Sequence, residues 1–437
     1  MTMERELAGK IETRSATIAV IGQGYVGLPL ALEYARAGFT AIGIDNDPDR
    51  VAALNFGQSP TPDVPDAELR ELLASGRYRA TGDFKALAQS DVVIICVPTP
   101  LRKSKDPDIS YVIAASEQTA VNFHPGQLVV LESTTYPGTT DELLIPMLAQ
   151  RGATVGETVF VAFSPERIDP ANKQFKVKDI PKVVGGATAA CTRMAAALYR
   201  TIVPHVYEVS SPTVAELAKL YENTFRNINI ALANEFAVMC RKLGVSSKEV
   251  VDAAATKPFG FMPFYAGPGI GGHCIAVDPF YLSWKMRLNG YEPRFIHIAD
   301  EINASMPEYV VEMVADALNE RAKSVKGSAV LALGVAYKAN VGDTRESPAL
   351  EILAMLRAKG AQVAYSDPWV PNTPIGETEL KSVELTDQRV ADADCVLILA
   401  DHAAFDYAAI VAKAGLVVDA RNATWGLEAP EGRIVRL

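Results

Sequence analysis

The glycine-rich turn near the N-terminus constrains the fold of this chain more than any other feature. An apolar run, Ala16–Ile21, ends in Gly22-Gln23-Gly24-Tyr25-Val26-Gly27, and a helical pattern follows over Leu28–Ala37. The first glycine of such a turn permits a sharp bend, the second lets backbone approach a pyrophosphate, and the third allows close helix packing. A second apolar run, Thr40–Ile44, is closed by Asp45. The pattern predicts a dinucleotide-binding β-α-β unit.

Asp45 and Arg50 bear on which dinucleotide this unit prefers. A carboxylate at the end of the second strand accepts hydrogen bonds from ribose hydroxyls and repels a 2′-phosphate. Asp45 therefore favours NAD as the cofactor, although Arg50 is a nearby cation that a 2′-phosphate would attract. An acid that merely caps a helix or a turn is the alternative interpretation of Asp45.

Further strands follow in the first part of the chain. Short apolar runs stand at Val92–Val97, Leu128–Leu131 and Val159–Phe163, with helical stretches between them. Strands that alternate with helices indicate a parallel sheet covered on both faces. Thr99 and Thr134 come just after two of these strands, where hydroxyls suit ribose or amide contacts. Because threonine also forms turns, ordinary loops are the alternative there.

The pattern changes twice more along the chain. Val214–Leu243 contains neither Gly nor Pro and predicts one long helix, closed by Gly244. From Ser328 onward strands alternate with helices again, but the turn Gly334–Lys338 lacks the glycine fingerprint. We expect an α/β protein, in which two Rossmann-like, doubly wound domains are joined by a central helical domain with a long helix. The expected domains are residues 1–211, 212–318 and 319–437.

Composition narrows the class of protein. Hydrophobic residues make up 49% and charged residues 22%, and the formal net charge of −10 disfavours nucleic acid or an anionic membrane as a partner. No apolar run approaches the ~20 residues of a spanning helix. The five cysteines are scattered without a C-x-x-C pair, as in proteins of a reducing compartment. We expect a soluble, cytoplasmic protein.

Cys274 differs from the other four cysteines, which lie in apolar contexts. It follows Gly271-Gly272-His273 and opens a predicted helix. A helix N-terminus favours the thiolate, which is the nucleophilic form of cysteine. Asp278, four residues on, falls on the same helix face. His273 is either a base or a structural residue, and no ligand spacing indicates a metal.

The long helix carries a polar set on one face. Lys219, Asn223 and Arg226 are spaced by four and three residues, so their side chains are neighbours. Such a face is either simply solvated or, beside a reactive cysteine, a cation-and-amide site for an oxyanion or an activated water.

Several separate motifs, in order along the chain, resemble those of the UDP-glucose/GDP-mannose dehydrogenases. The resemblance runs from about Thr17 to Trp425. The motifs are Gly22–Pro29, Ser133–Thr140, Ser164–Arg167, Glu216–Asn223, Gly271–Cys274 and Asp343–Pro348. The resemblance implies an NAD-binding domain, a central dimerisation domain and a C-terminal UDP-sugar-binding domain, and hence a homodimer or a larger homo-oligomer.

The resemblance also implies a reaction. A nucleotide sugar's C6 alcohol is oxidised to a carboxylate by two NAD+ and one water. Cys274 would hold the aldehyde as a thiohemiacetal and then as a thioester. Lys219 and Asn223 would stabilise the oxyanion and place the water, with Glu166 and Asp278 as supporting acid and base groups.

Ligand contacts follow from the fingerprint and the resemblance together. The expected contacts with NAD are Gly22, Gly24, Tyr25, Val26, Gly27, Asp45, Arg50, Thr99, Thr134 and Arg345. The expected contacts with the UDP-sugar are Arg226, Phe264, Tyr265, Gly271, Tyr337 and Lys338. The general base stays open, because Asp169 stands near Glu166 but one position away from the second acid of some family members.

The sugar is indicated by the loop around the cysteine. His273 replaces the serine usual in UDP-glucose enzymes, and Thr256–Pro279 resembles the branch that oxidises UDP-N-acetylhexosamines. This resemblance favours UDP-N-acetylglucosamine and a uronic acid for a surface polysaccharide. UDP-glucose and UDP-N-acetylmannosamine are the alternative substrates, and a non-catalytic nucleotide-sugar-binding protein is a remote alternative. The aromatic residues of Phe259–Tyr265 either enclose an acetamido group or pack the loop onto the central domain.

Overall fold

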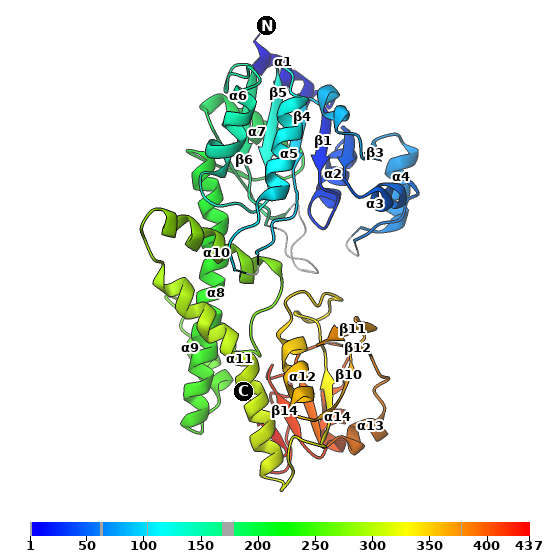
Figure 1. The fold of residues 1–437 in the computed structure, drawn as a ribbon, viewed down its shortest axis with the longest axis vertical. Helices are drawn as coiled ribbons and strands as arrows, with labels where there is room; N and C mark the ends of the chain where they lie inside the picture. Colours follow the sequence, from blue (N-terminus) through cyan, green and yellow to red (C-terminus); the bar gives the residue numbers. More distant parts are fainter. Residues whose placement is uncertain (1, 62–63, 103, 168–178, 377) are drawn as a thin grey trace. The chain divides into compact units, whose positions relative to one another are not determined.

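The computed structural model describes residues 2–437, apart from 62–63, 103, 168–178 and 377. The chain divides into two compact units (Figure 1). The first contains residues 1–222 and 280–291, and the second contains residues 223–279 and 292–437. Among the described helices, none combines the length and apolar character needed to cross a membrane.

The first unit contains an eight-stranded sheet in the order β3-β2-β1-β4-β5-β6-β7-β8. The strands are β1 Thr17–Ile21, β2 Thr40–Ile44, β3 Tyr78–Thr81, β4 Val92–Ile95, β5 Gln127–Leu131, β6 Val159–Phe163, β7 Lys182–Gly186 and β8 Val206–Val209. Neighbours are parallel except for β6 and β7. The order of the first six strands is that of a doubly wound dinucleotide-binding sheet.

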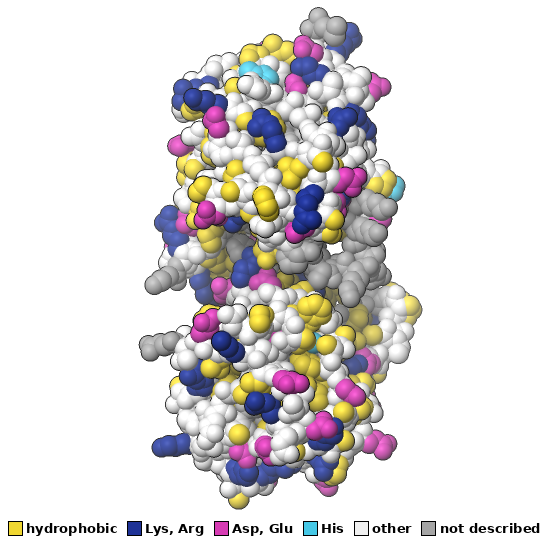
Figure 2. All heavy atoms as spheres, turned by 90° about the vertical axis from the view of Figure 1, so that its right-hand side faces the viewer, with side chains coloured by type: hydrophobic (Ala, Val, Ile, Leu, Met, Phe, Trp, Pro, Cys, Tyr) yellow, Lys and Arg dark blue, Asp and Glu magenta, His cyan; other side chains and the backbone are white. Residues whose placement is uncertain are grey.

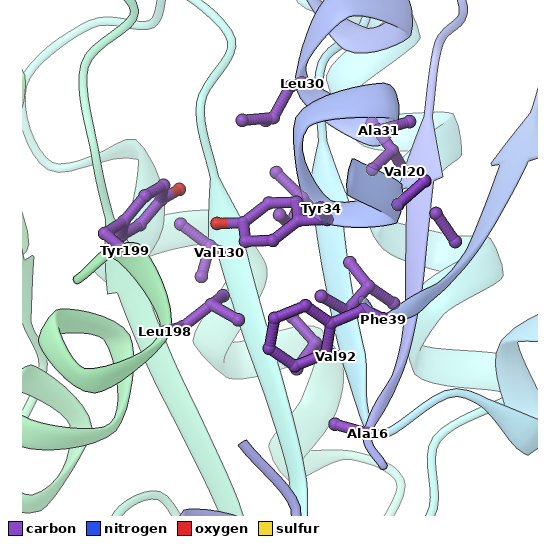
Figure 3. Packing of buried hydrophobic residues seen from close by; sticks show 14 of the residues in the cluster. Ala16, Val20, Leu30, Ala31, Tyr34, Phe39, Val92, Val130, Leu198 and Tyr199 are labelled. Atoms are coloured by element: carbon purple, nitrogen blue, oxygen red, sulfur yellow. The ribbon is translucent and has the colours of Figure 1, made fainter. Parts of the chain in front are cut away.

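Helices cover both faces of this sheet, and its central strands are therefore buried on both sides. Val20 and Ile94 belong to the cluster that includes α2 and α7, whereas Ala19 and Val93 belong to the cluster that includes η1 and α5. Figure 3 shows the first of these clusters, with Tyr34 and Phe39 packed against Val92. The helical segments are α1 Met3–Glu12, α2 Gly27–Arg36, α3 Pro48–Asn55, α4 Asp66–Ala74, η1 Phe84–Gln89, α5 Ser110–Val121, η2 Thr140–Leu144, α6 Ile145–Ala149 and α7 Ala189–Tyr199.

Four more helices follow the first sheet. They are α8 Pro212–Lys242, α9 Ser247–Ala255, α10 His273–Leu288 and α11 Arg294–Asn319. The long helix predicted over Val214–Leu243 is confirmed as α8, and Gly244 follows it with a φ of +70°, which favours glycine. Cys274 lies at the second position of α10, as the sequence predicted.

The second unit contains a smaller parallel sheet in the order β10-β9-β13-β14-β15. Its strands are β9 Ala329–Leu333, β10 Gln362–Ser366, β13 Cys395–Ile398, β14 Val417–Asp419 and β15 Ile434–Arg436, and β11 Asn372–Ile375 pairs with β12 Thr378–Lys381 as a separate hairpin. The helices after β9 are α12 Pro348–Ala358, α13 Asp387–Asp392 and α14 Tyr407–Lys413. α11 and α12 pack on one face, and α13 and α14 on the other. The predicted fold class is confirmed.

Charges are mixed on the surface drawn in Figure 2. Basic and acidic side chains are interspersed over that face, and hydrophobic ones are scattered among them. No extended region of positive charge gathers on the described residues of this face.

Candidate functional site

The glycine turn after β1 has the geometry that its sequence predicts. A Cβ atom on Gly22 would lie 2.3 Å from the carbonyl oxygen of Cys96, and one on Gly27 would lie 1.8 Å from the carbonyl oxygen of Gly22. A Cβ atom on Gly24 would have no neighbour within 4 Å. Gly22 and Gly27 are therefore required by the fold itself. Gly24 leaves open space beside the start of α2, which fits a pyrophosphate.

Asp45 lies directly after β2 and is 4% exposed. Its Oδ2 atom accepts hydrogen bonds from the N–H of Gln23 at 2.8 Å and from Nη1 of Arg50 at 3.0 Å. Its Oδ1 atom accepts one from the N–H of Asp47 at 3.0 Å. Each carboxylate oxygen has about two acceptor positions. Among the described residues, one position on Oδ1 thus stays available for a ribose hydroxyl, so the site fits NAD.

Polar residues gather at the carboxyl ends of β4 and β5. Thr99 and Thr134 are both buried in the loops that follow these neighbouring strands. Ser133 links the loops, because its Oγ accepts a hydrogen bond from the N–H of Val97 at 2.8 Å. Glu216 of α8 holds the second loop by accepting bonds from the N–H groups of Gly138 and Thr140. Burial raises the pKa of Glu216 against the effect of these donors.

Glu166 follows β6, the next strand of the same sheet, and only 10% of its side chain is exposed. Its Oε1 atom accepts a hydrogen bond from the N–H of Arg167 at 2.7 Å, and its Oε2 atom lies 3.6 Å from Nζ of Lys182. Lys219 of α8 is 6% exposed, so the solvated interpretation of this residue is wrong. Asp169 and the side chain of His273 lie outside the described part of the chain.

Cys274 is exposed at the start of α10, whereas Cys96, Cys191, Cys240 and Cys395 are buried. Pro279 lies inside α10 and has no N–H to donate to the carbonyl four residues earlier. That carbonyl belongs to Ile275, and it accepts a hydrogen bond from Nδ2 of Asn227 on α8 at 3.1 Å instead. The proline therefore creates the acceptor through which α8 holds the first turn of α10, where the thiol lies.

Asn223 and Asp278 form a second link between α8 and α10. Asn223 Nδ2 donates to Asp278 Oδ2 at 2.6 Å, and Asp278 is fully buried. Because the carboxylate must accept, this bond fixes the amide orientation. Asp278 lies one helical turn after Cys274, as predicted.

A chain of buried asparagines extends this link to the start of the glycine loop. Asn234 Oδ1 accepts a hydrogen bond from the N–H of Gly267 at 2.9 Å, and Asn234 Nδ2 donates to Asn303 Oδ1 at 2.9 Å. Asn303 Nδ2 in turn donates to the carbonyl oxygen of Asn227 at 3.3 Å. Both ends of the loop that precedes Cys274 are thus fixed by side-chain amides of α8 and α11.

The loop between β9 and α12 lies against the same glycines. The Gly272 N–H donates to the carbonyl oxygen of Arg345 at 3.1 Å, and a Cβ atom on Gly272 would lie 2.8 Å from the ring of Tyr337. A Cβ atom on Gly271 would lie 2.6 Å from the Cβ of Tyr337. Tyr337 and Lys338 are half-buried, and Arg345 is exposed and pairs with Asp343. These loops therefore meet only because the cysteine is preceded by two glycines.

Sequence reasoning missed the groups that shape this loop. Asp367, after β10, accepts hydrogen bonds from the N–H groups of Val335 and Ala336 at 2.8 and 3.2 Å. Buried His402 lies 3.1 Å from the same carboxylate and accepts the N–H of Asn340 on Nδ1. Nε2 is thus the protonated nitrogen. Only the position of Asp367 at a strand end hinted at this role.

The remaining predicted residues are placed as follows. Tyr25 and Arg226 are exposed. Phe264 packs edge-on against Phe225 of α8, with ring centres 5.8 Å apart. Tyr265 donates to Asp252 of α9 at 2.8 Å. These last two contacts suit the interpretation that aromatics pack the loop. No group of three or more His, Cys, Asp or Glu side chains among the residues described is arranged to hold a metal ion.

Three family models match the chain in succession. The NAD-binding domain of the UDP-glucose/GDP-mannose dehydrogenase family matches residues 16–203, its central domain matches 213–305, and its UDP-binding domain matches 331–425. Together they match the two Rossmann-like regions and the helical segment between them.

Individual relatives agree with these matches. The chain is 39% identical to a UDP-N-acetyl-D-glucosamine 6-dehydrogenase of Pseudomonas aeruginosa over 81% of this chain and 83% of the relative. It is 35% identical to an NDP-N-acetyl-D-galactosaminuronic acid dehydrogenase of Ralstonia nicotianae over 89% of this chain and 91% of that relative. The solved structure of a UDP-D-ManNAc dehydrogenase from Pyrococcus horikoshii matches with a TM-score of 0.87 and 32% identity, covering 96% and 98% of the two chains. The chain therefore belongs to the UDP-glucose/GDP-mannose dehydrogenase family and is an NAD-dependent nucleotide-sugar dehydrogenase.

Proposed function

We propose that this chain oxidises the C6 alcohol of UDP-N-acetylglucosamine to the carboxylate in two successive NAD-dependent steps. The observation that carries the proposal is the exposed thiol of Cys274 at the start of α10, beside the linked pair Asn223 and Asp278. A dehydrogenase that stopped at the aldehyde would need no nucleophilic sulfur. The name of the Pseudomonas relative supports the sugar. We assign the product, a uronic acid, to the synthesis of a surface polysaccharide.

NAD+, when bound, supplies the hydride acceptor for both oxidations. We assign its pyrophosphate to the N–H groups of the turn Gly22–Gly27 and its ribose to Asp45. Arg50, Thr99, Thr134 and Arg345 complete the assigned contacts. For the UDP-sugar, we assign Arg226, Gly271, Tyr337 and Lys338 together with the loop that contains Phe264 and Tyr265.

Cys274 accounts for the four-electron outcome. Its thiolate adds to the aldehyde carbon, forming a C–S bond while the carbonyl electron pair moves onto oxygen. Loss of a second hydride from that carbon leaves a thioester, to which water adds before the C–S bond breaks and the thiolate departs. One alcohol and one water thus give one carboxylate, with two hydrides and three protons leaving.

The neighbouring side chains serve this sequence in the roles we assign them. One N–H of the Asn223 amide is committed to Asp278. Among the described residues, its second N–H and its carbonyl oxygen remain for an oxyanion or a water. Lys219, one turn earlier on α8, supplies positive charge to the oxyanion. Glu166 and Asp278 exchange protons with the alcohol and the water.

Replacement of the thiol tests the nucleophile. We expect Cys274→Ser to bind NAD nearly as well as the wild type but to form no uronate, because a hydroxyl is a poorer acceptor of the aldehyde and leaves poorly from an ester. The measurement is NADH formed per sugar, with uronate assayed directly. Cys240→Ala, at a buried cysteine, is the control and should keep two NADH per sugar. Two NADH per sugar from the serine variant would refute the assignment.

A panel of UDP-sugars tests the substrate. An acetamido group needs room for its methyl and partners for its N–H and C=O. The loop Phe259–Tyr265 offers exposed Phe259, Phe261 and Met262 together with its backbone. A site built to bond such a group penalises an analogue that lacks it, so kcat/KM for UDP-N-acetylglucosamine should exceed that for UDP-glucose by at least roughly tenfold. Equal values would favour UDP-glucose. The highest value for UDP-N-acetylmannosamine would favour that sugar, for which the similar Pyrococcus horikoshii enzyme is named.

We also propose that the chain acts as a cytoplasmic homodimer or larger homo-oligomer with domains at residues 1–211, 212–318 and 319–437. The support is the row of exposed apolar side chains on α8, namely Leu217, Tyr221, Phe225, Leu232 and Met239. Sedimentation of the full chain measures the assembly directly, and a monomer at micromolar concentration would contradict this part of the proposal.

A further inference from the structure

Lys182 is a buried cation to which the proposed mechanism gives no role. It is the first residue of β7, and only 10% of its side chain is exposed. Its Nζ donates to Glu132 Oε2 at 2.8 Å and to the carbonyl oxygen of Pro165 at 3.3 Å, and it lies 3.6 Å from Glu166 Oε2. One ammonium group therefore lies between two carboxylates, one of which is the proposed proton-exchanging group.

Glu132 fixes the ammonium from the other side. Its side chain, directly after β5, is completely buried. The hydroxyl of Tyr199 donates to its Oε1 atom, and Lys182 Nζ also lies 5.2 Å from the centre of the Tyr199 ring. Figure 3 shows Tyr199 with its hydroxyl directed toward that of Tyr34, within the buried cluster that covers one face of the sheet. Glu132 is thus held by Lys182 and Tyr199, both of which are buried.

The opposite charges of Lys182 and its two carboxylate neighbours favour their contact. Burial by itself would lower the pKa of Lys182, but Glu132 and Glu166 outweigh it and raise that pKa. Both carboxylates therefore favour the charged form of Lys182. Both oxygens of Glu166 are then directed, since Oε1 faces the N–H of Arg167 and Oε2 faces the ammonium. Because each oxygen has its own partner, the plane of the Glu166 carboxylate is fixed, and with it the direction in which the carboxylate faces a substrate.

We propose that Lys182, held by Glu132 and Tyr199, is a positioning residue that orients the Glu166 carboxylate for proton exchange. The inference rests on the role proposed above for Glu166. Lys182 itself touches neither sugar nor cofactor in this proposal. The competing explanation is structural: Lys182 would serve only to neutralise Glu132, because a lone buried charge is strongly destabilising.

A double variant separates the two explanations. Lys182→Met with Glu132→Gln removes both charges of the buried pair while keeping similar volumes, so neither is left unpaired. If Lys182 orients Glu166, the double variant should lose kcat by roughly tenfold to a hundredfold, as expected for a misplaced reacting group. The double variant also removes a cation 3.6 Å from Glu166 Oε2, so the limb of the pH–kcat profile that belongs to Glu166 should move toward higher pH. Wild-type kcat and an unmoved limb would establish the structural explanation.

Two further variants make the result decisive. Glu166→Gln identifies the limb, which should disappear. If Glu166→Gln retains the wild-type kcat and profile, the role of Glu166 fails and the inference fails with it. If Glu166→Gln loses activity but the double variant does not, the inference alone is overturned.

Glu132→Gln alone provides a test of opposite sign that does not depend on the stability of the double variant. It removes a negative charge and leaves Lys182 to act on Glu166 alone, so the same limb should move toward lower pH. Lys182→Arg keeps the charge and should retain most of the kcat that the double variant loses. A limb that stays in place in Glu132→Gln, or an arginine variant no more active than the double variant, would contradict the proposal.

Discussion

The two sheets that contain β1 and β9 make the same turn after these two strands. In the first unit, the N–H of Gly22 donates to the carbonyl oxygen of Ile44 at 2.7 Å. In the second, the N–H of Gly334 donates to the carbonyl oxygen of Ser366 at 2.9 Å. Both glycines have positive φ, +91° and +79°, so the backbone at both turns requires glycine. The third region of the chain therefore retains the turn although it lacks the fingerprint.

An acid follows the partner strand in both units, and it is used differently. Asp45 and Asp367 each accept the N–H of the residue after the glycine, at 2.8 Å in both cases. Asp367 also accepts two N–H groups on Oδ1, from Trp369 and Val370, and has Ala336 and His402 on Oδ2. Its acceptor positions are filled by the protein, whereas Oδ1 of Asp45 has a single donor among the residues described. The same scaffold thus supports a ligand only where an acceptor position is left over.

The chain after the turn differs as well. α2 begins at Gly27, so the first turn leads directly into a helix. α12 begins at Pro348, and the long intervening loop carries Tyr337 and Lys338. The first unit offers a helix N-terminus to a phosphate, and the second offers side chains on a loop that Asp367 holds in place.

The largest effect that this comparison predicts is that of Asp367→Asn. An amide nitrogen would face N–H groups that now donate to a carboxylate, so the free energy of unfolding should fall by about 2–4 kcal/mol. Denaturant unfolding measures the loss, and KM for the UDP-sugar should rise as the Tyr337 loop loosens. NAD affinity should be unchanged. If Asp367→Asn is as stable as the wild type, the hydrogen bonds to Asp367 do not stabilise the protein, and the contrast with Asp45 fails.

The pH dependence of the same carboxylate gives an independent check. Burial alone would raise the pKa of Asp367, but His402 and the backbone N–H groups outweigh it and hold that pKa below its usual 3.8. The stabilisation is therefore complete above about pH 3.8 and is lost as the pH falls through the lower pKa of the folded state. The stability difference between wild type and Asp367→Asn should shrink only in that acid range. A difference that shrinks near neutral pH would point to His402 instead.

Two glycine variants should have the next largest effects. Gly22→Ala places a Cβ atom against the Cys96 carbonyl at a positive φ, so it should lower the free energy of unfolding by about 1–3 kcal/mol. Gly24→Ala adds a methyl group to open space, so stability should stay within about 0.5 kcal/mol while NAD binding weakens roughly tenfold. Calorimetric binding and thermal unfolding of both variants supply the comparison. If both variants bind NAD as tightly as the wild type, the turn serves the fold and not the cofactor.

The sequence predicted those parts of the fold that are buried on both sides. Val92–Ile95 and Val159–Phe163 read as strands because every one of their residues is covered. The edge strand β8 was missed because its side chains are exposed or half-exposed, and β7 was missed because it starts with a lysine and ends with two glycines. A strand is recognised in a sequence by alternating or continuous apolar residues, and neither β7 nor β8 has such a pattern.

The candidate site was predictable to the same extent. Cys274 could be identified because a cysteine after two glycines departs from an apolar context. The pair of Lys182 and Glu132 could not, since the two residues are 50 positions apart and each looks like an ordinary strand-end residue. Asp367 was equally hidden, because its main partners are backbone N–H groups, which leave no trace in the sequence. Pairings of this kind are set by the tertiary structure and leave no pattern in the sequence.

The smallest predicted effect concerns Asp45, the acid with an acceptor position to spare. Asp45→Ala removes the ribose acceptor and the charge that repels a 2′-phosphate, and it releases Arg50, which now donates to the carboxylate at 3.0 Å. NAD affinity should therefore fall by roughly tenfold, equivalent to about 1.4 kcal/mol, and NADP should bind better than it does to the wild type. Dissociation constants for both dinucleotides measure the change.

Arg50 then decides how that shift in preference arises. If the released guanidinium attracts the 2′-phosphate, the double variant Asp45→Ala with Arg50→Ala should lose the gain in NADP affinity while keeping the loss of NAD affinity. If removal of the repelling carboxylate is sufficient, both variants should bind NADP equally well. If the cofactor preference of the single variant is unchanged, Asp45 serves only to stabilise its turn, as Asp367 does. The hydrogen bond that Asp45 accepts from the N–H of Gln23 at 2.8 Å would then account for its role.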